Sequence, residues 1–408
     1  IYRYIYPKKK INLFILLLII SILPVISLLR AGDYESGDFN IHIYRIIAFF
    51  NVLKEGILMP SWAADLNSSY GNPLFIFNYS FPYYLISLFH FLGIDFINGA
   101  KLYLGLVFYL SGIAMYFATK EITGNKLASF TSSVFYMFNP YHLIDVHFRA
   151  TLGESTIFLI VPLLFFLITK YFKENNYLYL ILNSLLTVTM VMAHPLLAVS
   201  FSILITLYIL FIGIIKRKIK FIFLSISSLA LGGIAASYAW VSFIIYKPYM
   251  FNFPSDTPIF YAFDYFFYSP WRYGFLFQGP KGELAEIVGY TQFLVLIILA
   301  ILYLKNKIKS SLKHYILFWI TMFLLLLFLM HPFSIFFWKK LPFFWMLLPY
   351  GRLSLIVTFC TSILAGYLAF IYSNKKQSRT MVYILIIITI GYTILNWGHR
   401  RVIPEITE

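Results

Sequence analysis

The sequence has few charged residues, few acids and almost no cysteine. Of its 408 residues only 12% are charged, and 16 Asp and Glu stand against 32 Lys and Arg. Cys360, the one cysteine, lies inside an apolar run, which excludes a disulfide framework and a cysteine-based metal site. The formal net charge of +16 comes without a basic helix or an RNA-binding motif, so we expect no nucleic-acid partner.

Apolar residues dominate instead. They make up 61% of the chain, and several runs approach the roughly 20 residues that a helix needs to cross a bilayer. The pattern predicts an all-α, polytopic membrane protein, a single domain over residues 1–408 with about eleven transmembrane helices. The first run precedes a charged loop rather than a cleavage site, so we expect it to be retained. The expected spans are 11–29, 99–119, 127–138, 155–171, 178–193, 196–215, 221–246, 288–304, 315–330, 353–372 and 381–397.

Lysine concentrates in short loops on one side of these runs. The positive-inside rule places that side, with the N-terminus, in the cytoplasm of a cell-membrane protein. Nearly all acids and most arginines then fall on the outer, non-cytoplasmic face. Because arginine binds phosphate oxygens through a planar fork, this sorting indicates an outer site for an anionic substrate. The alternative is that these arginines pair with the outer acids for structure.

The first outer loop, residues 30–98, begins with the string "SGDFNIHIYR". Its Ser and Asp favour a helix start, and no proline follows before Glu55, so an interfacial helix is expected. On that helix Asp38, His42 and Arg45 fall within an arc of roughly 60°. The polar face is therefore either part of a site or an N-cap with salt-bridge companions.

The same loop continues into the proline-punctuated segment "MPSWAADLNSSYGNP". Trp62, Tyr70 and Asn72 in this segment suit the floor of an interfacial cavity, where rings stack on a sugar or a lipid head group and amides donate hydrogen bonds. They suit an aromatic belt equally well. The apolar stretch 83–91 that follows is too short to span a bilayer.

The second outer loop reads "NPYHLIDVHFRATLGES". Asp145, Arg149 and Glu154 cluster there, and ionisable groups near membrane depth indicate function by default. Arg149 and Glu154 paired with each other are the structural alternative. A third outer loop, residues 247–287, is rich in aromatic residues and either caps the cavity or lies in the interface.

The strings "GDFNIHIYRIIAFFNVLKEG", "HFRATLGES", "AHPLLA" and "LPYGRLSL" carry a family resemblance. Together they resemble bacterial integral membrane proteins labelled "6-pyruvoyl-tetrahydropterin synthase-related". That family is similar to the GT-C glycosyltransferases, multi-span enzymes that use polyprenyl-phosphate-linked sugars on the non-cytoplasmic face. The resemblance implies a polyprenyl-phosphate sugar donor and contact with membrane lipid.

The resemblance also implies roles for single residues. An acid early in the first outer loop acts as general base or metal ligand in such enzymes, and Asp38 holds that place. Glu154 or Asp145 matches the second acid, which comes from the next outer loop. Arg352 in "PYGRLSL", followed by Arg149, matches the arginines that hold lipid phosphate.

The remaining assignments complete a mechanism in which an acceptor hydroxyl displaces the lipid phosphate with inversion at the anomeric carbon. His42 orients Asp38 or joins it as a ligand of a divalent cation, magnesium or manganese, although Asp38 lacks the adjacent acid of a DxD pair. Arg45 neutralises phosphate charge, and the aromatic loop with Trp62, Tyr70 and Asn72 binds sugar and acceptor. A lipid or solute transporter and a non-catalytic lipid-binding or assembly protein are the alternatives.

Overall fold

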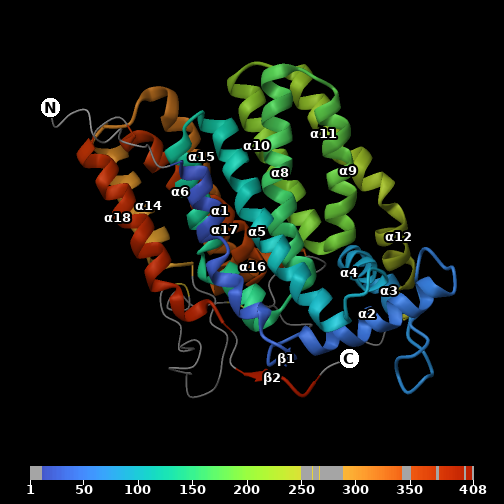
Figure 1. The fold of residues 1–408 in the computed structure, drawn as a ribbon. Coiled ribbons are helices and arrows are strands. Elements are labelled where there is room, and N and C mark those ends of the chain that lie inside the picture. The colour runs from blue at the N-terminus through green and yellow to red at the C-terminus, as the bar shows by residue number, and fades with distance from the viewer. Residues whose placement is uncertain are drawn as a thin grey trace.

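The computed structural model describes residues 12–249, 260, 266, 288–341, 351–373, 376–398 and 401–406, and most of these residues are helical (Figure 1). The loop 247–287 falls largely outside the described residues, so its predicted capping role lies there too. The longer helices are α1 (Leu13–Ile20), α2 (Phe39–Lys54), α4 (Phe81–Phe91), α5 (Phe96–Thr123), α6 (Lys126–Met137), α8 (Leu152–Glu174), α9 (Leu178–Ala193), α10 (Pro195–Ile215), α11 (Ile219–Ala235), α12 (Ser237–Tyr246), α14 (Tyr290–Leu304), α15 (Ser310–Met330), α17 (Leu353–Tyr372) and α18 (Lys376–Tyr392).

Short elements connect them. The short helical turns are η1 (Leu23–Leu29), α3 (Leu74–Phe77), α7 (Pro140–Ile144), the π turn η2 (Asp145–Arg149), η3 (Lys247–Tyr249), η4 (Pro332–Ser334), α16 (Ile335–Trp338) and η7 (Ile394–Asn396). Two strands, β1 (Asp33–Tyr34) and β2 (Val402–Ile403), pair antiparallel, with Asp33 opposite Ile403.

Five of the described helices are long and apolar enough to cross a membrane: α5, α8, α10, α15 and α17. The pair α11 and α12 counts as a sixth if its two halves, bent by 59°, form one span. The expected eleven spans are not confirmed, because several apolar runs form shorter helices. For example, α6 has 12 residues and α9 has 16, both below the roughly 20 that span a bilayer.

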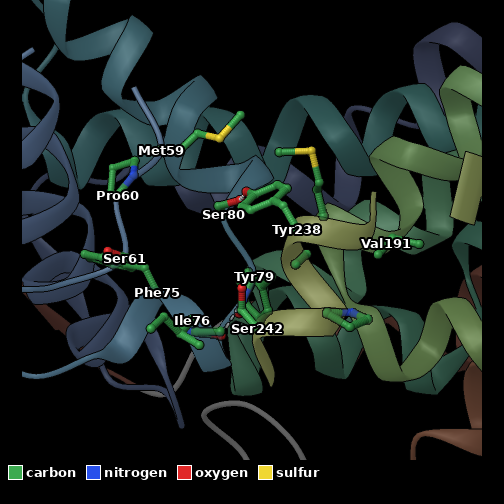
Figure 2. Close-up of a pocket in the computed structure, with 14 residues that line it drawn as sticks. Met59, Pro60, Ser61, Phe75, Ile76, Tyr79, Ser80, Val191, Tyr238 and Ser242 are labelled. Carbon is green, nitrogen blue, oxygen red and sulfur yellow. Dashed lines mark hydrogen bonds between the residues drawn. The ribbon is translucent and has the colours of Figure 1, made fainter. Parts of the chain in front are cut away.

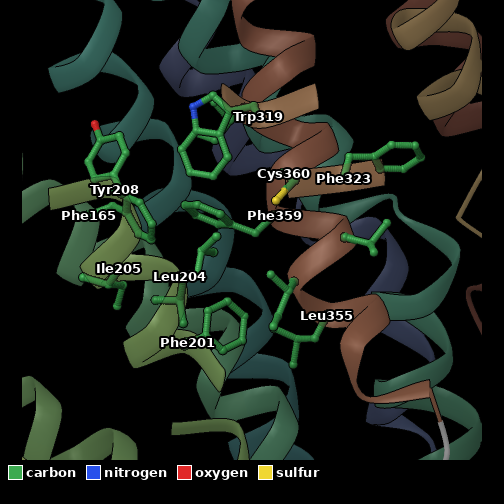
Figure 3. Packing of buried hydrophobic residues seen from close by; sticks show 14 of the residues in the cluster. Phe165, Phe201, Leu204, Ile205, Tyr208, Trp319, Phe323, Leu355, Phe359 and Cys360 are labelled. Carbon is green, nitrogen blue, oxygen red and sulfur yellow. The ribbon is translucent and has the colours of Figure 1, made fainter. Parts of the chain in front are cut away.

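The core lies where α8 and α17 meet their neighbours, and both are buried on nearly all sides. Figure 3 shows Phe165 of α8, Tyr208 of α10, Trp319 of α15 and Phe359 of α17 packed together. The ring centroids of Phe165 and Phe359 are 4.5 Å apart, and those of Tyr208 and Trp319 are 5.6 Å apart. Helices that are apolar all round are suited to such a central position.

The first loop and the C-terminal strand gather at one end of the bundle, where Figure 1 places α2, α3, α4, β1 and β2. The helix predicted after Ser36 is present as α2, and the short apolar stretch forms the 11-residue α4; their position in the membrane interface stays a prediction. The loops that carry lysine contact one another away from α2. Lys173 Nζ donates to Glu121 Oε1 at 2.9 Å, and Lys218 Nζ donates to the Phe172 carbonyl at 3.2 Å. Which side of the membrane each end faces stays a prediction.

Candidate functional site

Asp38 is held beside the second loop by its own backbone. The Gly37 N–H donates to the Phe148 carbonyl at 2.7 Å, and the Asp38 N–H donates to the Arg149 carbonyl at 2.9 Å. Both carbonyls belong to the π turn η2, a rare wide turn that is often found at functional sites. This turn therefore aligns the start of α2 with Arg149.

The Asp38 side chain is not used as a helix cap. Ser36 Oγ accepts the hydrogen bond from the Phe39 N–H at 3.1 Å, whereas the Asp38 carboxylate accepts none from the described residues. The N-cap interpretation of Asp38 is therefore wrong for its side chain. The carboxylate is only partly exposed and remains available to a ligand.

Charges from three other elements act on this carboxylate. Burial raises the pKa of Asp38; the Arg149 guanidinium then lowers it, Glu154 raises it, and Arg45 and Arg352 lower it. These charges come from α2, η2, the first turn of α8 and the residue before α17. The structure thus brings together residues that lie more than 300 positions apart in the sequence.

Arg149 is buried at the centre of an ion-pair network. Its Nη1 lies 2.6 Å from Asp145 Oδ1 and 2.9 Å from Glu154 Oε2, and its Nη2 lies 2.8 Å from Glu154 Oε1. The Tyr141 hydroxyl donates to Glu154 Oε2 at 2.9 Å and also accepts from Arg149. The pairing of Arg149 with Glu154, which the sequence left as an alternative, is what the structure contains.

Arg352 and His194 border the open side of the same network. Arg352 Nε lies 3.4 Å from Glu154 Oε1, and its side chain is 21% exposed, against 3% for Glu154. His194 Nδ1 accepts from the Leu197 N–H at 3.3 Å, which leaves its Nε2 directed to Glu154 Oε1 at 4.0 Å. A ligand therefore reaches Arg352 more easily than it reaches Arg149.

His42 points into the protein from α2, one turn after Asp38. Its Nδ1 lies 3.0 Å from the Tyr83 hydroxyl, and its Nε2 lies 3.1 Å from the Tyr79 hydroxyl. Burial, aided by the Arg45 charge, lowers the pKa of His42 to about 3, so the ring is neutral. His42 thus positions two tyrosines, and the Tyr79 ring in turn stacks on His194 with centroids 5.8 Å apart.

The arrangement gives little support for a metal at this site. Both His42 ring nitrogens already face tyrosine hydroxyls, and the described residues include no group of three or more His, Cys, Asp or Glu that suits a metal ion. The Asp38 and His42 ligand pair stays a prediction, and we derive no step through a cation.

The predicted site residues fall into three sets. The charges of Arg45, Arg149, Glu154 and Arg352 all act on Asp38, and His42 lies one turn after Asp38 on α2. Asp145 is fully buried against Arg149.

Trp62, Tyr70 and Asn72 form the third set. They lie on an exposed loop that pairs Ala63 with Asn72, and no contact joins them to the Asp38 network among the described residues. Tyr70 is 84% exposed. Their predicted part in binding sugar and acceptor receives no support here and stays a prediction.

Sequence reasoning missed Tyr79, Tyr83, Tyr141 and His194 as site residues. The signal was present in the strings "NYSFPYY" and "AHPLLA", but aromatic residues are so frequent here that a single tyrosine carries no information. His194 also caps α10, since its side chain accepts from the Leu197 N–H.

The apolar helices define a multi-pass integral membrane protein. The family described as "6-pyruvoyl-tetrahydropterin synthase related domain; membrane protein" matches residues 76–398, and the chain belongs to this family. A relative from Lactococcus lactis subsp. cremoris (strain MG1363), described as an uncharacterized protein, is 24% identical over 234 residues. These cover 55% of this chain but 38% of the relative, so the chain spans well under two thirds of that protein.

Proposed function

We propose that the protein transfers a sugar from a polyprenyl-phosphate donor to an acceptor hydroxyl at the Asp38 end of the bundle. The observation that carries the proposal is the Asp38 carboxylate itself. It is partly buried, accepts no hydrogen bond from the described residues, and lies within the field of Arg45, Arg149 and Arg352. An acid facing several cations suits a reaction that needs a base and a stabilised phosphate leaving group.

The bond changes are those of a direct displacement. Asp38 takes the proton of the acceptor hydroxyl, and the oxygen forms a bond to the anomeric carbon. The bond from that carbon to the lipid-phosphate oxygen breaks, and the phosphate keeps the electron pair. Arg352 and Arg45 neutralise its charge, while Glu154 and Arg149 hold Arg352 in place.

An apolar groove beside Arg352 supports a lipid-borne donor. It lies between α10, α15, α16 and α17, has a volume of about 380 Å³ and is lined almost wholly by apolar residues. Leu353, which follows Arg352 directly, belongs to the lining. A phosphate at Arg352 is therefore adjacent to a surface that suits an isoprenoid chain.

The proposal is tested by reconstituting the purified protein in liposomes with radiolabelled polyprenyl-phosphate sugars and a set of hydroxyl acceptors. We expect transfer from at least one donor, with inverted configuration at the anomeric carbon. Retained configuration would contradict direct displacement with Asp38 as the base. Absence of transfer with every donor would favour a transporter or a non-catalytic lipid-binding protein.

The pH dependence of transfer is expected to report Asp38. A base must be ionised, so the rate falls as pH decreases through its pKa; because burial raises this pKa, the fall occurs above the usual value of about 3.9. Arg45→Gln removes a charge that lowers the pKa of Asp38, so the acid limb of a rate profile is expected to move to higher pH.

Arg30→Gln is the matched control for this shift. Arg30 lies in the same loop, is exposed, and is not among the charges that act on Asp38. Its substitution is expected to leave the acid limb unmoved. Equal shifts in the two variants would mean that general surface charge, and not Arg45, sets the profile.

A further inference from the structure

A second cavity lies on the far side of Tyr79 from the Asp38 network, and we propose that it binds an uncharged, hydroxyl-bearing membrane lipid. The head group would lie in a small pocket lined by both hydroxyl-bearing and apolar side chains, and the chain in an apolar groove that continues from it. The inference goes beyond the proposed function, because this lipid is not the acceptor that Asp38 deprotonates. The binding itself does not depend on transfer.

The pocket has a volume of about 70 Å³ and lies between the segment after α2, α3 with the residues that follow it, the end of α9 and α12 (Figure 2). Hydroxyl and amide groups of Ser61, Asn78, Ser80, Tyr238 and Ser242 line it together with apolar side chains. Tyr238 and Ser80 meet with their hydroxyl oxygens 3.3 Å apart. The Ser61 and Ser242 hydroxyls have no hydrogen-bond partner among the described residues, so they can bond to a ligand.

The residues that line the pocket favour an uncharged ligand. This lining contains no Lys, Arg, Asp or Glu, although 32 basic residues are present in the chain. A phosphate or carboxylate in such a pocket would lack a counter-charge and lose its hydration, which is costly. Hydroxyls, in contrast, exchange hydrogen bonds with the serine and tyrosine hydroxyls at little cost.

The apolar groove starts where the pocket ends. Val191 and Pro195 line both, and from there the groove runs along α9, α10 and α11 with a volume of about 500 Å³. Ile203 and Leu207 of the candidate span α10 lie in its wall, so the groove opens toward the lipid phase. This continuity of polar pocket and lipid-facing groove is what selects an amphipathic lipid over a soluble solute.

The bend between α11 and α12 shapes this site. The Trp240 indole Nε1 donates to the Gly233 carbonyl at 2.9 Å, which satisfies a backbone group at the break. Trp240 and Gly233 line the groove, while Tyr238 and Ser242 on the same short helix line the pocket. Because of the break, α12 contributes residues both to the head-group pocket and to the apolar groove.

Tyr79 connects the pocket to the proposed chemistry. Tyr79 lines the pocket, its hydroxyl contacts His42, and its ring stacks on His194 beside Glu154. The head group would therefore lie one side chain away from the Asp38 network.

The test uses the full chain in lipid nanodiscs containing a diacylglycerol probe with a photoreactive chain, and measures which peptides become labelled. We expect labelling of α9, α10 and α11. A phosphatidate probe with the same chain, which differs only by its charged phosphate, is expected to label these helices much less. Equal labelling by the two probes would overturn the proposal of an uncharged head group.

Gly233→Phe is the blocking variant. A Cβ at Gly233 would meet no atom within 4 Å, and Gly233 lines the groove, so a larger side chain there is expected to occupy the groove. We expect labelling by diacylglycerol to fall roughly tenfold, equivalent to about 1.4 kcal/mol. Gly391→Phe on α18 is the matched control, since a Cβ there also meets no atom within 4 Å, and its labelling is expected to stay unchanged.

Unchanged labelling in Gly233→Phe, or equal loss in both glycine variants, would overturn the proposed groove. The double variant Ser61→Ala with Ser242→Ala gives a second readout, because it alters the pocket without filling the groove; undiminished labelling would refute the head-group site. Asp38→Asn is expected to be labelled like the wild type. Failure of the lipid site is therefore distinguishable from failure of the proposed transfer reaction.

Discussion

Replacement of Arg149 by alanine is expected to destabilise the protein by about 3–5 kcal/mol, the cost typical of breaking a buried ion pair from one side. Arg149 satisfies Asp145 through Nη1 and Glu154 through both Nη1 and Nη2, and all three side chains are at most 8% exposed. Without the guanidinium, two carboxylates remain buried in a region of few alternative cations. The same change removes the cation that lowers the pKa of Asp38 most.

The measurement is unfolding of the purified variant in bicelles, followed by a method that resolves free energies in lipid. Lys173→Ala is the control, because Lys173 pairs with Glu121 at 2.9 Å but is 45% exposed. Exposed pairs contribute about 0–1 kcal/mol, so this variant is expected to unfold almost like the wild type. Comparable losses in the two variants would contradict a buried network centred on Arg149.

Replacement of Asp38 by asparagine is expected to lower the transfer rate by roughly 10²- to 10⁴-fold, the usual contribution of a general base. The amide keeps the size of the side chain but accepts no proton. The backbone bonds from Gly37 and Asp38 to η2 do not involve the side chain, and Ser36 caps the helix, so the fold is expected to persist.

Glu55→Gln supplies the comparison for Asp38→Asn. Glu55 follows the other end of α2, is exposed, and is not among the charges that act on Asp38. Its rate is expected to equal that of the wild type. A loss of transfer rate in Glu55→Gln as large as in Asp38→Asn would indicate that removal of any carboxylate next to α2 slows transfer, and would contradict a specific role of Asp38.

The part of the site that follows local rules was predictable from sequence. Cap residues before an apolar-periodic run indicated α2, and helical spacing placed Asp38, His42 and Arg45 on one side of it. The cluster in the second loop was predictable because ionisable groups are rare in such a chain. Their assembly into one network depends on the π turn η2, whose carbonyls accept from Gly37 and Asp38, and no local pattern announces that turn.

The span count shows what apolar composition leaves open. The run at 127–138 is apolar enough to suggest a span, yet α6 is a 12-residue helix buried inside the protein. Ser132 Oγ of α6 donates to the Ser362 carbonyl of α17 at 2.8 Å, whereas Ser129, Thr131 and Ser133 donate to carbonyls one turn earlier in their own segment. A hydrophobic run that faces protein and one that faces lipid look alike in sequence, because both environments exclude water.

The aromatic loop illustrates a second limit. Trp62 and Tyr70 are residue types that often stack on sugars. The segment between them, however, folds back on itself through Asn67, Ser68 and Ser69, which have left-handed backbone conformations. A Cβ at Gly71 would lie 2.2 Å from Trp62 Nε1, so the indole rests on this glycine and not on the Asp38 network. Exposure of an aromatic residue is set by such turns and by neighbours distant in sequence.

The central claim, that Asp38 deprotonates the acceptor hydroxyl while Arg352 holds the phosphate of the donor, is tested most directly by single-turnover transfer in the presence of acceptor. Wild type and Asp38→Asn are loaded with radiolabelled polyprenyl-phosphate sugar, and donor binding and the rate of the first turnover are measured on the same samples. We predict similar donor affinity and a first turnover at least about 100-fold slower in the variant. An unchanged first turnover at full donor occupancy would contradict the assignment of Asp38.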